Sequence, residues 1–328
     1  MQAVVVSHTG GPEVLELQER VDPEPGPGQV VVEVAASGVN FIDTYQRSGQ
    51  YPMTTPFIAG SEGAGVLTEV GSDVPDLAVG DHVAWASVPG GGYAEKVAIP
   101  ADRAVPVPSG IDDETAAAVM LQGMTAHYLC TSTYRVQPGD DVLVHAGAGG
   151  VGLLLTQMVK LKGGRVIATT STVEKAALAR QAGADDVIDY TQDDVATEVR
   201  RLTGGAGVAV VYDGVGQATF ESSLDSLRTR GMLVLFGAAS GPVPSFDPQV
   251  LNRKGSLYLT RPTLAHYIAD RAALLARAAQ IFDWIAAGQL SVRIGARYPL
   301  GEAAQAHADL AGRRTTGKVL LVPGRPTR

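Results

Sequence analysis

Short apolar or alternating runs, separated by turn residues, dominate the first third of the chain. Strands are predicted over 2–7, 29–37, 65–70 and 82–86, and a Pro- and Gly-rich cluster at 22–28 separates the first two. The regular spacing of the turns favours a closed or rolled β domain. The segment Val88–Tyr93, with three consecutive glycines, is expected to form a flexible loop.

From about Asp112 the pattern changes to alternating strands and helices. A helix with acidic residues near its start is predicted to run to Tyr128. Further strands are then expected over 141–145, 165–170, 186–190, 208–213, 232–237 and 256–260, and helices over 150–162, 173–182, 193–203 and 217–228. Strands joined by single helices imply right-handed crossovers and a parallel, doubly wound (Rossmann) sheet.

The end of the chain returns to other elements, a long helix over 264–287 and a final strand over 318–322. A length of 328 residues at about 150 residues per domain predicts two domains. We therefore expect an α/β fold in which residues 123–263 form a nucleotide-binding domain. This domain would be inserted in a β-rich domain built from residues 1–122 and 264–328.

Composition narrows the classes of function. The 26 basic and 34 acidic residues give a net charge of −8, which argues against nucleic-acid binding. The single cysteine, Cys130, excludes an internal disulfide and a multi-cysteine zinc site, and it suits the cytoplasm. No signal peptide is recognised, and the longest uncharged run, 142–159, contains four glycines, so no membrane segment is predicted.

The strongest chemical motif is Ala146-Gly-Ala-Gly-Gly-Val-Gly152. It holds G-x-G-x-x-G at Gly147, Gly149 and Gly152, with Gly150 and Val151 inside the turn. It follows a predicted strand and opens a predicted helix. Glycines at these positions allow a tight turn, close approach to a pyrophosphate and close helix–strand packing. The motif predicts a dinucleotide site.

The residues at the end of the next strand favour NADPH over NADH. An NAD site usually has Asp or Glu there, but this chain has Thr169-Thr-Ser171, and its first acid lies inside the next helix. Ser171 can donate to a 2′-phosphate and Lys175 can supply positive charge. Alternatively, Ser171 and Thr172 only cap the helix and Lys175 is solvated.

Several motifs together resemble one family. The stretch 139–152, with Gln157 and Lys160, is similar to the quinone oxidoreductase (zeta-crystallin) signature of the medium-chain dehydrogenase/reductase superfamily. The stretches 38–45, 211–216 and 255–262 also match, so the similarity covers nearly the whole chain and includes bacterial NADPH:quinone reductases. The resemblance implies a GroES-like catalytic domain around the Rossmann domain. Gly147 departs from the alanine common in this group.

The resemblance also bears on metal binding. Gly60-Ser-Glu62 follows the alcohol dehydrogenase zinc signature with Ser61 in place of the ligand histidine, and Asn40 stands where a ligand cysteine is found. Ser and Asn are poor zinc ligands. His127 and Cys130, spaced i and i+3, are two residues and do not complete a site. No metal is expected, and quinone reduction would proceed by direct hydride transfer without zinc or flavin.

The resemblance further implies a site in the cleft between the domains. Residues expected to face the acceptor are Asn40, Tyr45, Tyr51 and Arg261. Residues expected along the cofactor, besides the glycine-rich turn, are Thr125 near the nicotinamide, Phe236 and Gly237 beside it, and Lys175 and Tyr190 near the adenosine phosphate. Alternatively, Asn40 and Tyr45 support a local turn, Arg261 pairs with an acid, and Phe236 is core. Asp43 is expected to cap a short helix.

Other functions remain open at this point. The protein could reduce an enone, an alkenal or an enoyl-thioester, or bind RNA as zeta-crystallin relatives do, although the net charge disfavours RNA. The strand expected over 256–260 would be an exposed sheet edge, which favours a homodimer that continues the sheet. The expected partner is a small quinone or conjugated carbonyl.

Overall fold

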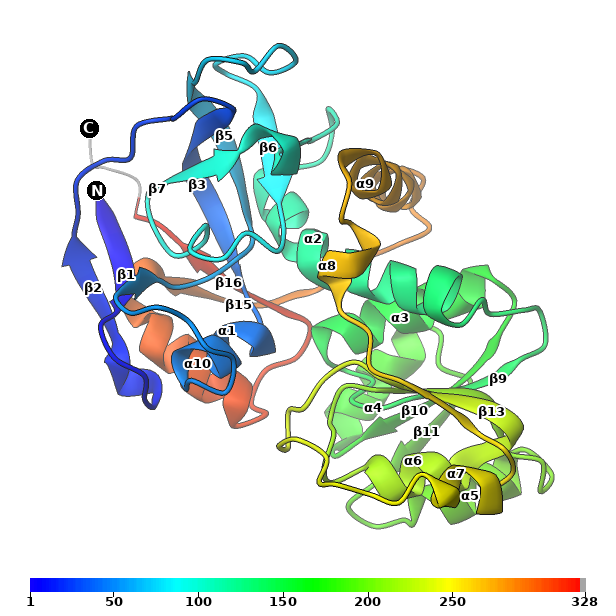
Figure 1. Cartoon of the computed structure of the whole chain (residues 1–328). Helices are drawn as coiled ribbons and strands as arrows, with labels where there is room; N and C mark the ends of the chain where they lie inside the picture. Colours follow the sequence, from blue (N-terminus) through cyan, green and yellow to red (C-terminus); the bar gives the residue numbers. More distant parts are fainter. Residues whose placement is uncertain (325–328) are drawn as a thin grey trace. The chain divides into compact units, whose positions relative to one another are not determined.

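A computed structural model describes residues 1–324, and the chain divides into two compact units. Unit 1 contains Met1–Met124, Ile268–Gly288 and the residues from Val292 onward; unit 2 contains Thr125–Tyr267 and Gln289–Ser291. Unit 1 is thus built from both ends of the chain (Figure 1). Within residues 1–324, no helix is long and apolar enough to cross a membrane.

Unit 1 is rich in antiparallel strands. One sheet has the order β15-β16-β3-β5-β6-β8, with β7 also paired to β3, and a smaller sheet has the order β2-β1-β4. The strands are β1 (Gln2–Val6), β2 (Leu15–Glu19), β3 (Gln29–Val39), β4 (Phe57–Ile58), β5 (Gly63–Val70), β6 (His82–Trp85), β7 (Lys96–Pro100), β8 (Val105–Pro106), β15 (Ile294–Pro299) and β16 (Lys318–Val322). The pairing of Val319 with Val39 joins the last strand to β3.

The helices of this unit are α1 (Phe41–Arg47), α9 (Arg271–Ala286), α10 (Ala303–Ala311) and most of α2 (Asp113–Tyr128). Short 3-10 turns cover Pro12–Val14, Ala101–Arg103 and Leu300–Glu302. Buried Val, Leu and Ala side chains fill the interior together with Trp85, Tyr93 and Ile99.

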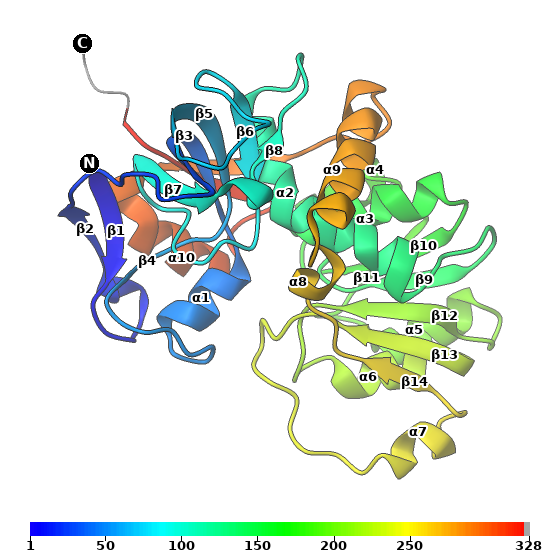
Figure 2. The ribbon, with the colours of Figure 1, turned by 45° about the horizontal axis from the view of Figure 1, so that its top comes forward.

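Unit 2 is a six-stranded, wholly parallel sheet with the order β11-β10-β9-β12-β13-β14. Figure 2 shows β12, β13 and β14 side by side. The strands are β9 (Asp141–Val144), β10 (Arg165–Thr170), β11 (Asp186–Asp189), β12 (Val208–Asp213), β13 (Leu227–Leu235) and β14 (Tyr258–Thr260). The strand order reverses between β9 and β12, the place where such sheets bind ligands at their carboxyl edge. The expected doubly wound sheet is confirmed.

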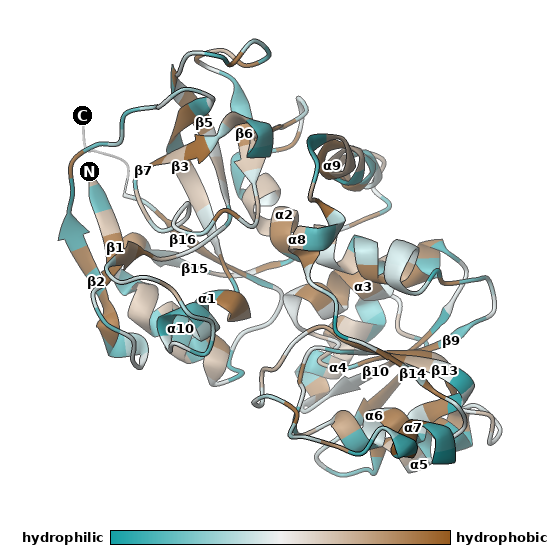
Figure 3. Cartoon of the chain, viewed as in Figure 1, coloured by the Kyte–Doolittle hydropathy of each residue, from teal (hydrophilic) through white to brown (hydrophobic). Residues whose placement is uncertain are grey.

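The helices of unit 2 are α3 (Gly150–Leu161), α4 (Val173–Gln181), α5 (Val195–Leu202), α6 (Phe220–Ser226), α7 (Gln249–Arg253) and α8 (Leu264–Tyr267). A π-helical turn, Leu129–Thr133, continues α2. The Tyr212 hydroxyl donates to the carbonyls of Leu129 and Tyr134 there, at 3.2 and 3.3 Å. Hydropathy colouring shows apolar residues along β9, whereas α5 and α7 carry both apolar and polar residues (Figure 3).

Three expected elements are wrong in part. The helix expected over 264–287 is two helices, because the Asp270 carboxylate accepts from the Ala273 amide at 2.8 Å and begins α9 anew. The helix expected over 217–228 ends at Ser226, because Leu227 already pairs with Val208 in the sheet.

The third correction concerns Val88–Tyr93, expected to be a flexible loop. The second half of this segment is buried and hydrogen-bonded to neighbouring residues. The Ser37 hydroxyl donates to the Gly92 carbonyl at 2.6 Å, and the Trp85 indole donates to the Gly91 carbonyl. Consecutive glycines allow this backbone to pack closely, since a Cβ on Gly92 would lie 2.6 Å from Gly60 Cα.

Candidate cofactor and acceptor site

The glycine-rich turn lies between β9 and α3, as the motif predicts. The Gly147 amide donates to the Thr169 carbonyl of β10 at 2.9 Å. A Cβ on Gly147 would lie 2.7 Å from the Cβ of Ala168, and a Cβ on Gly152 would lie 3.0 Å from Gly147 Cα. Side chains at these two positions would therefore push the turn away from the sheet.

The first turn of α3 offers an anion site. Gly149 is the N-cap, and the first intrahelical bond runs from the Leu153 amide to the Gly149 carbonyl at 2.9 Å. The amides of Gly150, Val151 and Gly152 have no acceptor within the helix, and no acidic residue lies in this turn. The helix dipole and these amides favour a phosphate here.

A buried network of hydrogen-bonded side chains supports the glycine-rich turn. His145 has Nδ1 3.1 Å from Thr169 Oγ1 and Nε2 3.0 Å from Ser223 Oγ, and Ser223 donates to Asp213 at 2.8 Å. Burial lowers the pKa of His145, so its imidazole is neutral at neutral pH. Asp213 also accepts from the Gly216 amide at 3.0 Å. The turns after β9 and β12 are thus joined through one network.

The carboxyl ends of β10 and β11 bring Ser171 and Tyr190 near each other. Thr170 pairs with Asp189 in the sheet, and the Tyr190 amide donates to the Thr170 carbonyl at 3.1 Å. The N-cap of α4 is Thr172, whose hydroxyl accepts from the Lys175 amide at 3.2 Å. The capping role thus falls to Thr172 rather than Ser171. These residues suit a 2′-phosphate, and no acid ends β10.

Three further expected site residues follow the ends of strands: Phe236 and Gly237, expected along the cofactor, and Arg261, expected to face the acceptor. Phe236 follows β13, and its amide donates to the Asp213 carbonyl at 2.8 Å, as that of Gly237 does at 3.4 Å. The Phe236 ring is half-buried, not core, and a Cβ on Gly214 would meet it at 2.9 Å. Arg261 follows β14, is exposed, and donates to the Pro262 carbonyl at 3.2 Å. Thr125 is buried in α2.

The expected acceptor residues of unit 1 cluster at α1. Asn40 is its N-cap, Tyr45 lies on it, and Tyr51 follows it. The two tyrosine rings lie 5.3 Å apart, and the Tyr51 amide donates to the Tyr45 carbonyl at 3.0 Å. Tyr45 is 8% exposed and Tyr51 37%, so Tyr51 presents more of its ring to a ligand.

A buried ion pair that was not predicted lies against Asn40. Lys318 and Glu62 form a salt bridge with side-chain exposures of 1% and 0%. Lys318 Nζ also donates to Asn40 Oδ1 at 2.9 Å, and Asn40 Nδ2 donates to Glu62 Oε2 at 2.8 Å. A Cβ on Gly38 would lie 2.6 Å from Lys318 Cε, so glycine is required beside the pair. In the sequence, the sign of this ion pair was a single lysine, Lys318, at the start of an otherwise apolar strand.

A second buried hydrogen-bond network begins at Asp43. Asn40 and Asp43 form a capping box, so Asp43 supports the cap from the third helical position rather than being the cap. Tyr93 donates to Asp43 at 2.9 Å, His307 Nε2 lies 2.9 Å from the Tyr93 hydroxyl, and Arg47 lies 3.5 Å from His307 Nδ1. Arg47 can only donate, so His307 Nε2 carries the hydrogen that Tyr93 accepts.

Burial shifts the pKa of Asp43 and that of His307 in this network. Desolvation raises the pKa of Asp43 to about 7, opposed by the hydrogen bonds from Asn40 and Tyr93 and by the charge of Lys318. Desolvation, with the nearby Arg47 charge, lowers the pKa of His307 to about 3. The imidazole of His307 is therefore neutral near neutral pH, whereas the carboxyl of Asp43 loses its proton in that range.

The donor set around Asn40 does not suit zinc. The Ser61 hydroxyl lies 3.4 Å from Asp43, and the carboxylate of Glu62 is already paired with an ammonium group. Hydroxyl, amide and ammonium groups are poor ligands for this ion. Among residues 1–324, no group of three or more His, Cys, Asp or Glu is arranged to hold a metal.

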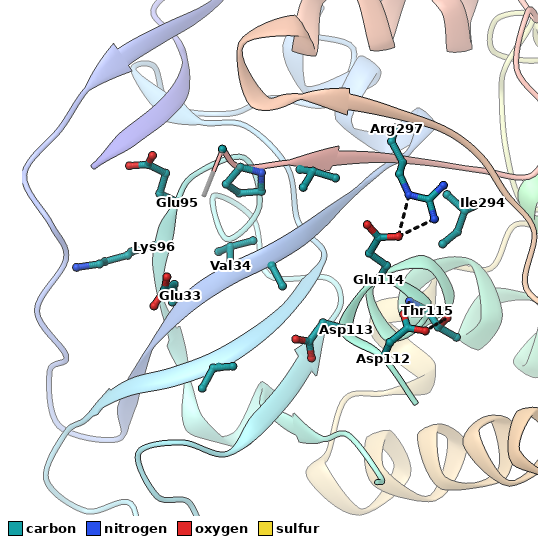
Figure 4. A pocket seen from close by; sticks show the side chains of 15 residues that line it. Glu33, Val34, Glu95, Lys96, Asp112, Asp113, Glu114, Thr115, Ile294 and Arg297 are labelled. Carbon is teal, nitrogen blue, oxygen red and sulfur yellow. Dashed lines mark hydrogen bonds and ion pairs between the residues drawn. The ribbon is translucent and has the colours of Figure 1, made fainter. Parts of the chain in front are cut away.

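An acidic pocket of about 760 Å³ lies elsewhere in unit 1 (Figure 4). Three of its acids have partners: Glu114 pairs with Arg297 at 2.6 Å, Asp113 with His82 at 2.8 Å, and Asp112 accepts from the Thr115 amide. None of the expected site residues lines it. This pocket is therefore separate from the candidate site.

Comparison with known proteins identifies the family. Residues 26–109 match the alcohol dehydrogenase GroES-like domain and residues 150–276 the zinc-binding dehydrogenase family. A quinone oxidoreductase from Pseudomonas aeruginosa is 50% identical over 96% of this chain and 97% of its own length. The chain belongs to the quinone oxidoreductase family. The expected family and its medium-chain dehydrogenase/reductase superfamily are thereby confirmed.

Two further proteins similar to this chain are informative. A 2-haloacrylate reductase from a Burkholderia species is 42% identical over 98% of this chain and 99% of its own length. The crystal structure of Escherichia coli quinone oxidoreductase complexed with NADPH aligns with a TM-score of 0.97 at 42% identity, covering 98% of this chain and all of that one. The zinc named in the matching family description does not fit the donor set found here.

Proposed function

We propose that this protein is an NADPH:quinone oxidoreductase that transfers hydride directly to its acceptor, without zinc or flavin. The observation that carries the proposal is the full-length similarity to quinone oxidoreductases together with an intact glycine-rich turn on β9 and α3. A quinone is already electrophilic, so orientation and electrostatics can supply most of the catalysis.

The residues of unit 2 fit NADPH. The amides of Gly150, Val151 and Gly152 would hold the pyrophosphate, and Ser171 and Lys175 the 2′-phosphate. Phe236 and Gly237 would border the nicotinamide, whose C4 supplies the hydride when the cofactor is bound. The missing acid at the end of β10 supports the phosphorylated cofactor.

On the acceptor side, Tyr45 and Tyr51 would stack against a flat ring, and Arg261 would stabilise developing oxyanion charge. The matched control for Arg261→Ala is Arg253→Ala, since Arg253 is also exposed, lies in unit 2 and pairs with Asp247 at 3.4 Å. We expect the change at Arg261 to lower kcat and the change at Arg253 to leave turnover unchanged. Wild-type turnover in Arg261→Ala would remove this role.

The decisive experiment follows NADPH absorbance with a panel of quinones, enones and an enoyl-CoA, and offers alcohols with NADP⁺. NADH is measured in parallel. Quinone-dependent oxidation of NADPH is expected. An enzyme that oxidises simple alcohols and ignores every conjugated carbonyl would contradict the proposal.

A second candidate function is reduction of a conjugated C=C bond. The 2-haloacrylate reductase among the relatives favours it, because the two chains align over nearly their full lengths. The panel should therefore include 2-chloroacrylate. Turnover of this substrate with inert quinones would replace the first proposal with the second.

We also propose a cytoplasmic homodimer formed at β14. This strand is the edge of the sheet, and its Tyr258 is 53% exposed. The single, buried Cys130 suits a reducing compartment. A monomeric mass in light scattering would exclude the dimer.

A separate filter-binding assay tests the RNA-binding alternative, which retention of RNA would support.

A further inference from the structure

The buried ion pair determines how the amide of Asn40 is oriented. An ammonium group can only donate and a carboxylate can only accept. Lys318 therefore requires the Oδ1 oxygen of Asn40 on its side, and Glu62 requires the Nδ2 nitrogen on the other. The weaker bond from Nδ2 to the Gly38 carbonyl, at 3.3 Å, uses the second amide hydrogen. Asn40 is thus fully engaged within the protein.

The same constraint passes to Gln122 on α2. Its Nε2 donates to Asn40 Oδ1 at 3.2 Å, and the reverse orientation would set two oxygens against each other. The Oε1 atom of Gln122 is consequently left on the other side of the amide. Within residues 1–324 this buried oxygen has no hydrogen-bond donor, although Gln122 is only 9% exposed.

A buried acceptor without a donor is unfavourable, and native proteins rarely keep one without a reason. Gln122 cannot relieve the cost by turning its amide, because Lys318 and Glu62 fix Asn40. Thr125, expected near the nicotinamide, lies three residues further along α2 and therefore on the same face of the helix. Gln122 therefore lies one helical turn before a residue that the family resemblance places near the nicotinamide.

We propose that Gln122 Oε1 accepts a hydrogen bond from a hydroxyl group of a bound ligand. A quinone cannot supply it, because its ring oxygens only accept. A hydroxyl is present on the ribose of NADPH, and it appears on the acceptor ring when a quinone becomes a quinol. The inference rests on the proposed function for the choice of these two probes.

Two substitutions separate the ligand bond from the bond to Asn40. Gln122→Met removes both, whereas Gln122→Glu keeps an oxygen acceptor and loses the donor that faces Asn40. Thr156→Val is the matched control, because Thr156 Oγ1 is a second buried atom without a partner in the described chain and lies inside α3. Thermal unfolding of each variant without ligand verifies that it is folded.

The measurements are the Kd for NADPH by titration calorimetry and the inhibition constant of 1,4-dihydroxybenzene, with 1,4-dimethoxybenzene as the ligand that lacks a donor. One neutral hydrogen bond predicts that Gln122→Met weakens one of the hydroxyl ligands by about three- to tenfold. Gln122→Glu is expected to retain most of that affinity. Thr156→Val should bind both probes as the wild type does.

Weaker NADPH binding alone would assign the hydroxyl to the cofactor, and weaker inhibition by the diol alone would assign it to the product. Equal losses in Gln122→Met and Gln122→Glu would show that only the bond to Asn40 matters, and unchanged affinity in both would show no role; either result overturns the inference. A wild-type protein that binds NADPH and reduces quinones keeps the proposed function whatever Gln122 does.

Discussion

Asp43 and His307 give unit 1 two opposite dependences of stability on pH, and substitutions can separate them. The pKa of Asp43 is raised in the folded state, so the folded protein holds this proton more tightly than the unfolded chain does. Its contribution is full at low pH and falls as pH rises to about 7. The pKa of His307 is lowered, so its contribution is full at neutral pH and is lost as pH falls toward 3.

The magnitude follows from the shifts. One pKa unit corresponds to about 1.4 kcal/mol, so each group changes the free energy of unfolding by about 1.4 kcal/mol per pH unit within its window. The shift of Asp43 from 3.8 to about 7 then corresponds to roughly 4 kcal/mol in total. Between about pH 4 and 6.5 the two slopes oppose each other and nearly cancel in the wild type.

The assay compares each variant with the wild type across this interval, which removes the titration of all other groups. Urea unfolding is followed by tryptophan emission, because Trp85 and Trp284 both belong to unit 1. From pH 4.5 to 6.5, Asp43→Asn should gain roughly 3 kcal/mol relative to the wild type, and His307→Gln should lose about the same.

A constant offset between variant and wild type, from lost hydrogen bonds, does not affect these slopes. The double variant should differ from the wild type by an amount independent of pH. A flat difference for Asp43→Asn, or a rising one for His307→Gln, would refute the burial-driven shifts on which this reasoning rests.

Three further outcomes are expected. Gly147→Ala should weaken NADPH binding and lower Tm, because the added Cβ would lie 2.7 Å from the Cβ of Ala168. Adding Ala168→Gly should restore the affinity and the Tm, and a double variant without this recovery would refute the steric cause. Lys318→Met should destabilise the protein by about 3–5 kcal/mol in urea unfolding, because it leaves Glu62 unpaired. Adding Glu62→Gln should recover most of this loss, and equal stability of the single and double variants would contradict the explanation. Lys175→Ala should raise the KM for NADPH more than that for NADH, and equal effects would remove it as a 2′-phosphate ligand.

The sequence predicted most of unit 2, because its elements are coded locally. The strands expected over 165–170 and 208–213 match β10 and β12 residue for residue, as the strand expected over 318–322 matches β16 of unit 1. The position of the glycine-rich turn between a strand and a helix was predicted for the same reason, since it requires a close approach within a few residues. The break at Asp270 was missed because apolar residues continue on both sides and only the side-chain cap reveals it.

The buried networks could not be predicted. Lys318 lies 256 positions from Glu62 and 278 from Asn40, and no local pattern pairs them. A lysine at the start of an apolar strand is ordinarily solvated. The roles expected of Tyr45, Tyr51 and Arg261 came from the family resemblance, and they stay predictions until their variants are measured.

The discontinuity of unit 1 has a consequence for synthesis. A ribosome releases all of the strands β9–β14 before it reaches codon 318, so the nucleotide-binding half of a nascent chain can fold while its first-made half still lacks β16. During that interval Glu62 has no counter-ion and β3 has an unpaired edge next to Val39. A message truncated just before this codon would therefore yield a product open to chaperones and proteases.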